Sequence, residues 1–383
     1  MTEEEKNKEG TDPQELTVDA LDGGTIENYE RLMKEFGIKP FAPLVQKLPA
    51  DKRHFLMTRG VIFGHTGMEQ VIDAIVNNKK FAVMTGIKPS NSYHIGSLTT
   101  AVEVVHFQKL GGKVYFCLAD FETYVVNRIP FSEAEKIAID NVADLLALGL
   151  DEKNAYIYKQ SAEPMVKHYG LIFSSHVTMN ELRGVYGLKT RLGYYNAAMV
   201  QIADILLPQI LEGPMPTVTP VGADQAPHAR LTRDIAKRGI FKQKFNLPSF
   251  TYHKLIAGID GSDKMSKRNP LSFFYLHDDM KDITYKLKNA FTGGKDTAAE
   301  QRKLGGNPDI CRIFDLYKFM FEPDDKALKE REERCRSGEL LCGTCKKELI
   351  EKVKEFREKH LELKTSYMDK AKEIVTSLET PDI

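Results

Sequence analysis

Two short segments contain the residue types that hold and activate a nucleoside triphosphate. Residues 88–97 (KPSNSYHIGS) follow a strand-like apolar run at 81–86 and precede a helical pattern at 98–110. A helix that begins near His94 and Gly96 offers unpaired N–H groups and a partial positive charge to a phosphate. Because Gly96 has no side chain, a nucleotide can lie against the backbone there.

The second segment, residues 263–268 (DKMSKR), is flanked by glycines and by Asn-Pro, so we expect a loop. Its ammonium groups, on Lys264 and Lys267, and the hydroxyl of Ser266 are suited to neutralising a triphosphate during group transfer. Either segment alone could form an ordinary surface connection. Together they predict an ATP site.

The pattern from residue 81 onward alternates strand and helix. Strand-like runs at 81–86, 113–120 and 155–158 are separated by helical patterns at 98–110 and 132–148. The second helix is expected to begin with Ser132 as N-cap and Glu135 as its capping-box partner. Such alternation predicts an α/β fold with a doubly wound, Rossmann-like parallel sheet. Ligands of such sheets bind beyond the carboxyl ends of the strands, where the first segment lies.

Shifts in composition divide the chain of 383 residues. The polar N-terminus predicts a disordered tail, and a helix is expected at 26–36. After about residue 275 strand signals give way to charged amphipathic helices. The expected regions are a tail at 1–15, an N-terminal extension at 16–80, a Rossmann catalytic domain at 81–275 and a helical domain at 276–383.

A second ligand-binding signal lies in two later elements. The helix at 195–208 is apolar nearly all round except for Gln201 and Asp204, which share one face. These polar groups either have partners inside the protein or line the pocket of a polar ligand. A strand at 218–222 then leads through Gly222 into Asp224 and Gln225, which again indicates a site at a strand end.

The C-terminal region contains four of the five cysteines. The Cys-x-x-Cys pair with two further thiols suggests a soft-metal site, either Zn²⁺ or an iron–sulfur cluster, in a reducing compartment. The alternative is four unlinked cysteines. The residues are Cys311, Cys335, Cys342 and Cys345, and the last two are expected to flank a glycine turn and to present two thiolates to one ion.

Composition predicts a globular protein without a membrane span. Lys plus Arg and Asp plus Glu both total 54, so net charge gives no support for nucleic-acid binding. The acidic N-terminus lacks the features of a signal or transit peptide. We therefore expect a cytoplasmic protein.

In this order and setting, the two phosphate-binding segments resemble the "HIGH" and "KMSKS" signatures of class I aminoacyl-tRNA synthetases. Ser97 stands at the second His of the first signature and Arg268 at the last Ser of the second. The resemblance implies activation of an amino acid by ATP and Mg²⁺, with catalytic roles for His94, Lys264, Ser266 and Lys267.

Further motifs narrow the resemblance to tryptophanyl-tRNA synthetases of the archaeal and eukaryotic type. They lie at residues 35–41, 59–65, 292–295, 300–306 and 335–346. A tyrosyl-tRNA synthetase is the nearest alternative, but it usually has Tyr where this chain has Met84. A nucleotide-binding regulatory protein that has lost activation chemistry is the alternative from another class.

The resemblance also implies roles for individual residues. Gln201 and Gln225 would face the amino acid, Glu122 would lie near the indole, and Asp204 would accept the indole N–H. Met84 and Cys117 differ from Tyr and Gln in some eukaryotic members, with consequences for indole and amino-group recognition. The implied ATP-binding residues are Gly86, Pro89, Ser90, His94, Gly96, Gly222, Asp224, Lys264, Met265 and Ser266.

The implied partners are tRNA(Trp), L-tryptophan and ATP, in a homodimer whose helical domain at 276–383 binds the anticodon. The cysteine spacing resembles that of family members with a [4Fe–4S] cluster beside this region.

Overall fold

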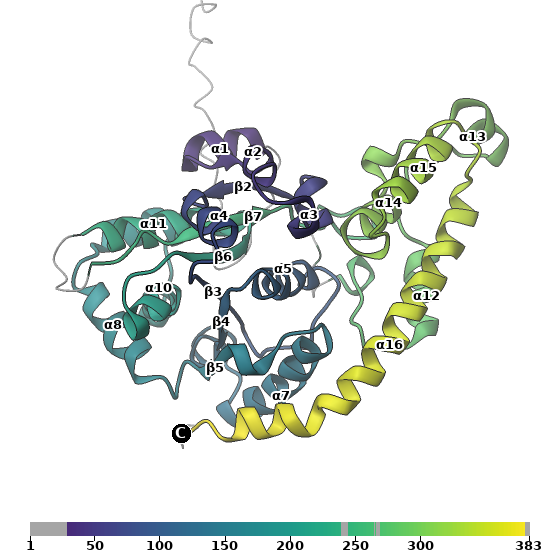
Figure 1. Ribbon diagram of the computed structural model, residues 1–383. Helices are drawn as coiled ribbons and strands as arrows, with labels where there is room; N and C mark the ends of the chain where they lie inside the picture. The colour runs from purple at the N-terminus through teal and green to yellow at the C-terminus, as the bar shows by residue number, and fades with distance from the viewer. Residues whose placement is uncertain (1–28, 239–243, 264, 266–268, 380–383) are drawn as a thin grey trace, which may run out of the picture.

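The computed structural model describes residues 29–238, 244–263, 265 and 269–379. The predicted tail at 1–15 and three of the predicted catalytic residues, Lys264, Ser266 and Lys267, lie outside these ranges. The described chain contains one seven-stranded sheet (Figure 1). Its strands are β1 (Lys39–Pro40), β2 (Ile62–Thr66), β3 (Ala82–Ile87), β4 (Lys113–Leu118), β5 (Ala155–Lys159), β6 (Thr217–Gly222) and β7 (Ser249–His253).

The sheet is mixed, with a parallel part and an antiparallel edge. The strand order is β1-β2-β7-β6-β3-β4-β5, and the five strands from β7 to β5 are parallel. β2 pairs with β7, and β1 with β2, in antiparallel register. The parallel part confirms the Rossmann-like prediction. The antiparallel edge was not predicted, and it shows that residues of the 16–80 segment complete the sheet.

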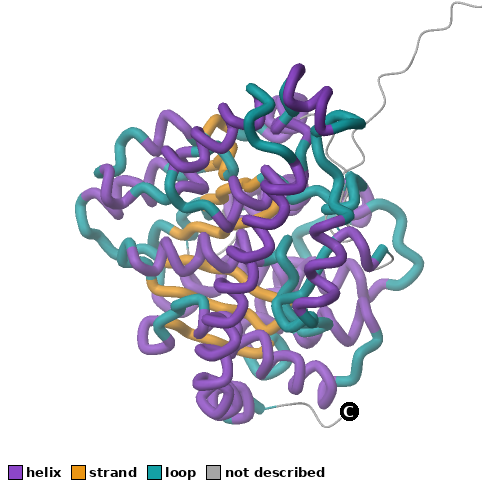
Figure 2. The backbone as a smooth tube through the Cα atoms, turned by 90° about the vertical axis from the view of Figure 1, so that its right-hand side faces the viewer, coloured by secondary structure: helices purple, strands orange, loops and turns teal. Residues whose placement is uncertain are grey.

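Helices cover both faces of the sheet (Figures 1 and 2). Beyond residue 275 the described chain forms helices and connections (Figure 1). The helices are α1 (Tyr29–Phe36), α2 (Ala42–Val45), α3 (Phe55–Thr58), α4 (Glu69–Val76), α5 (Leu98–Lys109), α6 (Asp120–Glu122), α7 (Phe131–Ala147), α8 (Pro164–Ser174), α9 (Met179–Tyr186), α10 (Leu192–Glu212), α11 (Ala226–Lys237), α12 (Met280–Lys288), α13 (Ala298–Leu304), α14 (Arg312–Leu316), α15 (Asp325–Arg336) and α16 (Cys342–Thr376).

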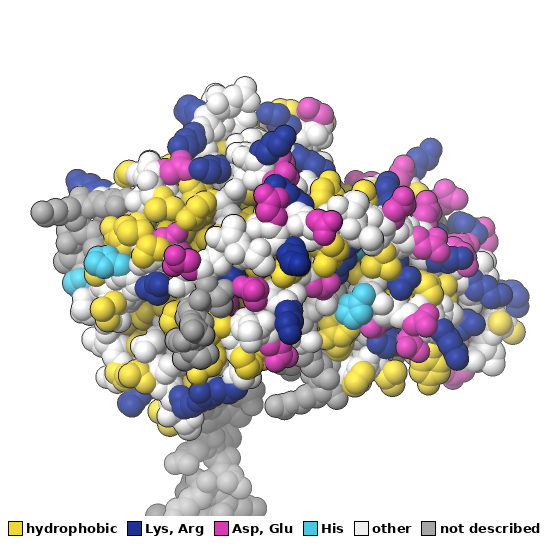
Figure 3. All heavy atoms as spheres, turned by 90° about the horizontal axis from the view of Figure 1, so that it is seen from below, with side chains coloured by type: hydrophobic (Ala, Val, Ile, Leu, Met, Phe, Trp, Pro, Cys, Tyr) yellow, Lys and Arg dark blue, Asp and Glu magenta, His cyan; other side chains and the backbone are white. Residues whose placement is uncertain are grey.

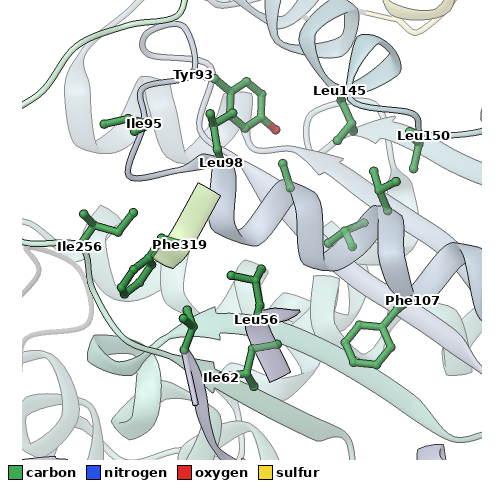
Figure 4. Packing of buried hydrophobic residues seen from close by; sticks show 14 of the residues in the cluster. Leu56, Ile62, Tyr93, Ile95, Leu98, Phe107, Leu145, Leu150, Ile256 and Phe319 are labelled. Carbon is green, nitrogen blue, oxygen red and sulfur yellow. The ribbon is translucent and has the colours of Figure 1, made fainter. Parts of the chain in front are cut away.

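Alternating residues of the central strands face two separate hydrophobic clusters. In β4, Val114 and Phe116 belong to a cluster with α5, α7 and the C-terminal helices, whereas Tyr115 and Cys117 belong to a cluster with α8 and α10. This is the two-residue period of a strand buried on both faces. The first cluster joins the sheet to the C-terminal helices, since Phe319 lies in it (Figure 4).

The start of α7 differs from the prediction. Pro130, with φ of −59° and ψ of 150°, precedes the first helical residue, and Ser132 lies within the first turn. Ser132 is therefore not the N-cap. Glu135, the expected capping-box partner, instead forms an ion pair with the buried Lys159 at 2.6 Å.

The surface agrees with the balanced charge of the sequence. Basic and acidic side chains are interspersed over the face shown in Figure 3. A helix with the length and apolarity needed to cross a bilayer does not occur among the described residues.

Candidate active site

A cavity of about 260 Å³ lies near the carboxyl ends of parallel strands, as the fold predicts. Its walls include Met84 and Gly86 of β3, Cys117 of β4 and Gly222 at the end of β6. Gly86 is required by close packing, because a Cβ there would lie 2.7 Å from Cys117 Cβ.

All the residues predicted to contact the amino acid line this cavity. Gln201 and Asp204 come from the middle of α10, and Gln225 from the connection between β6 and α11. Met84 and Glu122 come from β3 and α6 on the other side. The structure thus brings together residues from four separate parts of the chain.

Asp204 is almost fully buried, and its carboxylate has partners within the protein. Its Oδ1 accepts a hydrogen bond of 2.8 Å from Tyr158 Oη, and its Oδ2 accepts one of 2.6 Å from Gln160 Nε2. Burial raises the pKa of Asp204 to about 7, although these hydrogen bonds favour the charged form. A carboxylate has about four acceptor positions, so internal partners and a ligand contact are compatible.

Glu122 closes the cavity from α6. Its carboxylate lies 3.2 Å from Lys88 Nζ, and its backbone N–H donates to Gln160 Oε1 at 3.2 Å. Lys88 and Gln160 also line the cavity, and Gln160 therefore connects Glu122 with Asp204.

The sequence analysis did not assign site roles to Gln160, Tyr158 or Lys88. A signal for Gln160 was present, because it directly follows strand β5 at the edge where ligands of a parallel sheet bind. Tyr158 lies within that strand and carried no such signal.

His94 and Gly96 form a second group, at the start of α5. The Gly96 backbone N–H donates to His94 Nδ1 at 3.0 Å, which places the proton of a neutral imidazole on Nε2. Ser97, the residue that departs from the signature, accepts from the His94 N–H at 3.1 Å and donates to the His94 carbonyl at 2.8 Å. Ser97 thus stabilises the turn that presents His94.

The two sequence signatures meet at Met265. A Cβ added at Gly96 would lie 2.9 Å from Met265 Sδ and 3.0 Å from His94 Cε1. His94 also pairs with Tyr275 in an antiparallel bridge beyond the second signature. Met265 and Tyr275, which both follow Lys264 in the sequence, therefore lie against the helix start.

The other predicted ATP-binding residues lie around these groups. Gly86 and Gly222 line the cavity, and Asp224 Oδ1 would lie 2.7 Å from a Cβ at Gly222. Pro89 and Ser90 belong to the connection from β3 to the helix start, which joins the cavity to His94.

The four C-terminal cysteines line one small cavity of about 20 Å³. Cys342 and Cys345 lie in the first turn of α16, which corrects the expectation that they flank a glycine turn, because Gly343 is helical. Burial raises the pKa of Cys335 to about 11 and that of Cys345 to about 12. In the described chain, no group of three or more His, Cys, Asp or Glu residues is arranged to hold a metal ion.

The family model for class I tRNA synthetases of the tryptophan and tyrosine type matches residues 76–358 of the chain. With the Rossmann-like sheet and the cavity at its ligand-binding edge, this match defines the class: the chain belongs to the class I aminoacyl-tRNA synthetases.

Similar proteins identify the branch of the class. The tryptophan–tRNA ligase of Aeropyrum pernix is 41% identical over 366 residues, which cover 93% of this chain and 96% of that protein. The ligase of Methanocaldococcus jannaschii is 39% identical over 338 residues, 86% and 90% of the two chains. The crystal structure of the Aeropyrum pernix tryptophanyl-tRNA synthetase superposes with a TM-score of 0.85 at 38% identity and covers 95% of this chain and 100% of that one. The chain belongs to the tryptophan–tRNA ligases, which use ATP to join tryptophan to tRNA(Trp).

Proposed function

We propose that the 260 Å³ cavity holds the tryptophan side chain and that the His94–Gly96 turn holds the ATP phosphates during adenylate formation. The convergence of Gln201, Asp204 and Gln225 on one cavity supports this assignment most directly. In the reaction, the tryptophan carboxylate attacks the α-phosphorus of ATP and pyrophosphate leaves. The aminoacyl group then passes to the 2′-hydroxyl at the 3′ end of tRNA(Trp).

The part of the site that would bind the amino acid contains an oriented acceptor for a hydrogen-bond donor of the ligand. Asp204 has a fixed orientation because Tyr158 and Gln160 donate to its two oxygens, and the indole N–H would add a third donor. Gln201 and Gln225 would contact the polar part of tryptophan. Met84 and Cys117 would supply apolar parts of the wall, and Glu122 and Lys88 would supply charged groups.

At the ATP end of the site, the protein would position the phosphates and stabilise their negative charge, and the reaction needs no protein nucleophile. His94 Nε2–H can donate to a phosphate oxygen, because Nδ1 is occupied by the Gly96 N–H. Lys264, Ser266 and Lys267 would stabilise the charge that develops on pyrophosphate. Gly86, Gly222 and Asp224 would shape the ribose side, with Pro89, Ser90 and Met265 around the phosphates. Mg²⁺ binds chiefly through the ATP phosphates and water.

The four thiols around the cysteine cavity are the ligand set that a [4Fe–4S] cluster or a Cys₄ zinc site would use, and we propose the cluster. Four thiolates around one Zn²⁺ lie about 3.8 Å apart, from Zn–S bonds of about 2.3 Å in a tetrahedron. The four thiols of this chain face one cavity, although they are not grouped closely enough to hold a single metal ion. A cluster takes one thiolate at each of four separate corners. Arg331, whose Nη1 lies 3.7 Å from Cys345 Sγ, would offset the negative charge of the thiolates.

The remaining assignments concern assembly. We propose a homodimer, supported by exposed apolar side chains on α8, on the connection from α9 to α10 and at the start of α10. The residues are Leu171, Leu188 and Leu192, which are between 63% and 79% exposed. The helices from residue 276 onward would bind the anticodon, and the extension before residue 81 would support the ATP site. Light scattering during gel filtration tests the dimer.

Amino-acid-dependent ATP–pyrophosphate exchange, measured with each of the twenty amino acids, tests the function. We expect exchange with tryptophan and loss of it in His94→Ala. Exchange with tyrosine alone would support the other branch of the family. Absence of exchange with any amino acid would support the regulatory alternative.

A further inference from the structure

A hydrogen-bonded chain connects the ATP-binding loop with the long C-terminal helix. Ser92, two residues before His94, donates its hydroxyl to Asp140 Oδ2 at 2.8 Å. The other oxygen of the same carboxylate, Oδ1, lies 2.6 Å from Lys364 Nζ. Asp140 belongs to α7 and Lys364 to α16, so one carboxylate joins three segments that are distant in the sequence.

Neighbouring contacts reinforce both halves of this chain. On the loop side, Asn141 Nδ2 donates to the Asn91 carbonyl at 3.1 Å. On the helix side, Asp144 Oδ1 lies 2.8 Å from His360 Nε2, and its Oδ2 lies 3.0 Å from Lys364 Nζ. Asn141, Asp144 and His360 are almost fully buried, so these bonds form in a low-dielectric environment where they are strong.

The same loop is also held by packing of its apolar side chains into the hydrophobic core. Tyr93, Ile95 and Leu98 point into the hydrophobic cluster that also contains Leu145 of α7 (Figure 4). In this arrangement the loop is fixed at Tyr93 and Ile95 by packing and at Asn91 and Ser92 by hydrogen bonds. His94 lies between these fixed points.

The helix that carries Lys364 is long. α16 has 35 residues and is about 52 Å long at 1.5 Å per residue. It runs from the region of α13 and α15, where Cys342 and Cys345 lie, to α7 beside the sheet (Figure 1). The helix α16 thus contributes residues both to the cysteine cavity and to the contact with Asp140, which holds the loop before His94.

We propose that Asp140 and Lys364 are positioning residues for ATP. Together with Ser92 they tie the loop that presents His94 to the C-terminal helix and so fix the position and orientation of that loop. This inference rests on the proposed role of His94 at the ATP phosphates. Lys364 stands between two carboxylates, and without its charge Asp140 and Asp144 repel one another and Asp140 no longer holds Ser92 in place.

Steady-state ATP–pyrophosphate exchange separates the KM for ATP from the KM for tryptophan. Ser92→Ala removes only the loop contact and leaves the buried network intact. We expect its KM for ATP to rise about tenfold, the size of one lost hydrogen bond to a charged group, while the KM for tryptophan stays within about twofold. Asp140→Asn and Lys364→Met should act in the same direction, and Lys364→Arg should restore most of the ATP affinity.

A matched control lies on the same helix. Lys370 pairs with Glu373 at 3.1 Å and is 42% exposed in its side chain. Lys370→Met should leave both KM values unchanged. The double variant Ser92→Ala with Lys364→Met should raise the KM for ATP by less than the product of the single effects, because both act through Asp140.

Thermal unfolding separates positioning from mere stability. If Ser92→Ala and Asp140→Asn lower the melting temperature but leave the KM for ATP unchanged, or raise both KM values equally, the positioning role is wrong. His94→Ala tests the underlying assignment separately. Normal activation by His94→Ala would refute the role of the loop, whereas a defect in His94→Ala without one in Ser92→Ala would refute only the role of the chain.

Discussion

Tyr158 donates its hydroxyl to Asp204 Oδ1 at 2.8 Å, and the accepting carboxylate lines the cavity of about 260 Å³. The sequence left two explanations for Asp204 open, an internal partner or a ligand. The structure shows that the internal partner exists and that the residue nevertheless reaches the cavity wall. Tyr158 and Gln160 therefore orient the carboxylate without removing it from the site.

Asp204→Ala should reduce kcat/KM for tryptophan far more than for phenylalanine. A buried acceptor that is left without a donor lowers kcat/KM for the wrong ligand by a factor of roughly 10⁴–10⁵. An apolar pocket alone changes the transition-state binding energy of different side chains by only about 1–3 kcal/mol. Both amino acids should be measured with the parent enzyme and the variant. An unchanged ratio would show that Asp204 serves only its internal partners and that Glu122 is the next candidate for reading the indole N–H.

Tryptophan binding should weaken as the pH falls below about 7, because the raised pKa of Asp204 makes its carboxylate neutral there. A protonated carboxyl group has lost acceptor capacity toward the indole N–H. The Kd for tryptophan, measured by calorimetry between about pH 5.5 and 8.5, should show this titration. Asp204→Asn should bind weakly at every pH, and an equal pH dependence in that variant would assign the titration to another group.

Stability should change with pH in the opposite direction. Because burial raises the folded pKa of Asp204 above its value in the unfolded chain, the folded state binds the proton more tightly. The stability from this group is fully present below about pH 4 and is lost as the pH rises through about 7. Urea unfolding should therefore show Asp204→Asn gaining stability relative to the parent as the pH rises from 5 to 8. A constant difference would contradict this linkage.

Lys264→Ala should lower kcat for activation by roughly 10²–10³, about 3–4 kcal/mol, with little change in the Kd for tryptophan. Lys264 lies outside the described residues, but Met265 beside it contacts the start of α5 next to Gly96. Single-turnover adenylate formation is the direct measurement. Activation within about threefold of the parent would mean that the loop is structural only.

The parts predicted from sequence are those that local patterns determine. Gln201 and Asp204 stood out as two polar residues on an apolar helix, and both lie on α10 and line one cavity. Strands β3, β4 and β5 were similarly clear from their apolar runs. The prediction did not include β2, since Gly64 and His65 interrupt its apolar pattern and the segment becomes a strand through pairing with β1 and β7.

Contacts between segments that are distant in the sequence could not be predicted from local patterns. Gln160 meets Asp204 across 44 positions, and Ser92 meets Asp140 across 48, so no local spacing connects them. Gly343 was misleading in another way. It predicts a turn between Cys342 and Cys345, but glycine is tolerated in a first helical turn, where fewer intrahelical hydrogen bonds are lost.

Gly96→Ala should raise the KM for ATP by roughly tenfold through displacement of His94. The new Cβ would lie 3.0 Å from His94 Cε1 and 2.9 Å from Met265 Sδ, so one of these side chains must move. The clash with the flexible Met265 side chain can be removed by a second substitution, but the clash with the His94 imidazole cannot. Gly96→Ala with Met265→Ala should therefore retain most of the defect. Full recovery in the double variant would show that the clash with Met265, and not the position of His94, limits ATP binding.

The C-terminal cysteines should bind iron when the protein is purified without oxygen. Because burial raises the pKa values of Cys335 and Cys345, their thiols stay protonated in the metal-free protein and become thiolates only when a cluster supplies positive charge. Elemental analysis and visible absorption distinguish iron–sulfur from zinc. Cys345→Ser should lose the cluster, whereas Cys117→Ser, which alters the fifth cysteine, in the cavity of about 260 Å³, should keep it. Metal-free folded protein whose four C-terminal thiols all react freely with iodoacetamide would eliminate the centre.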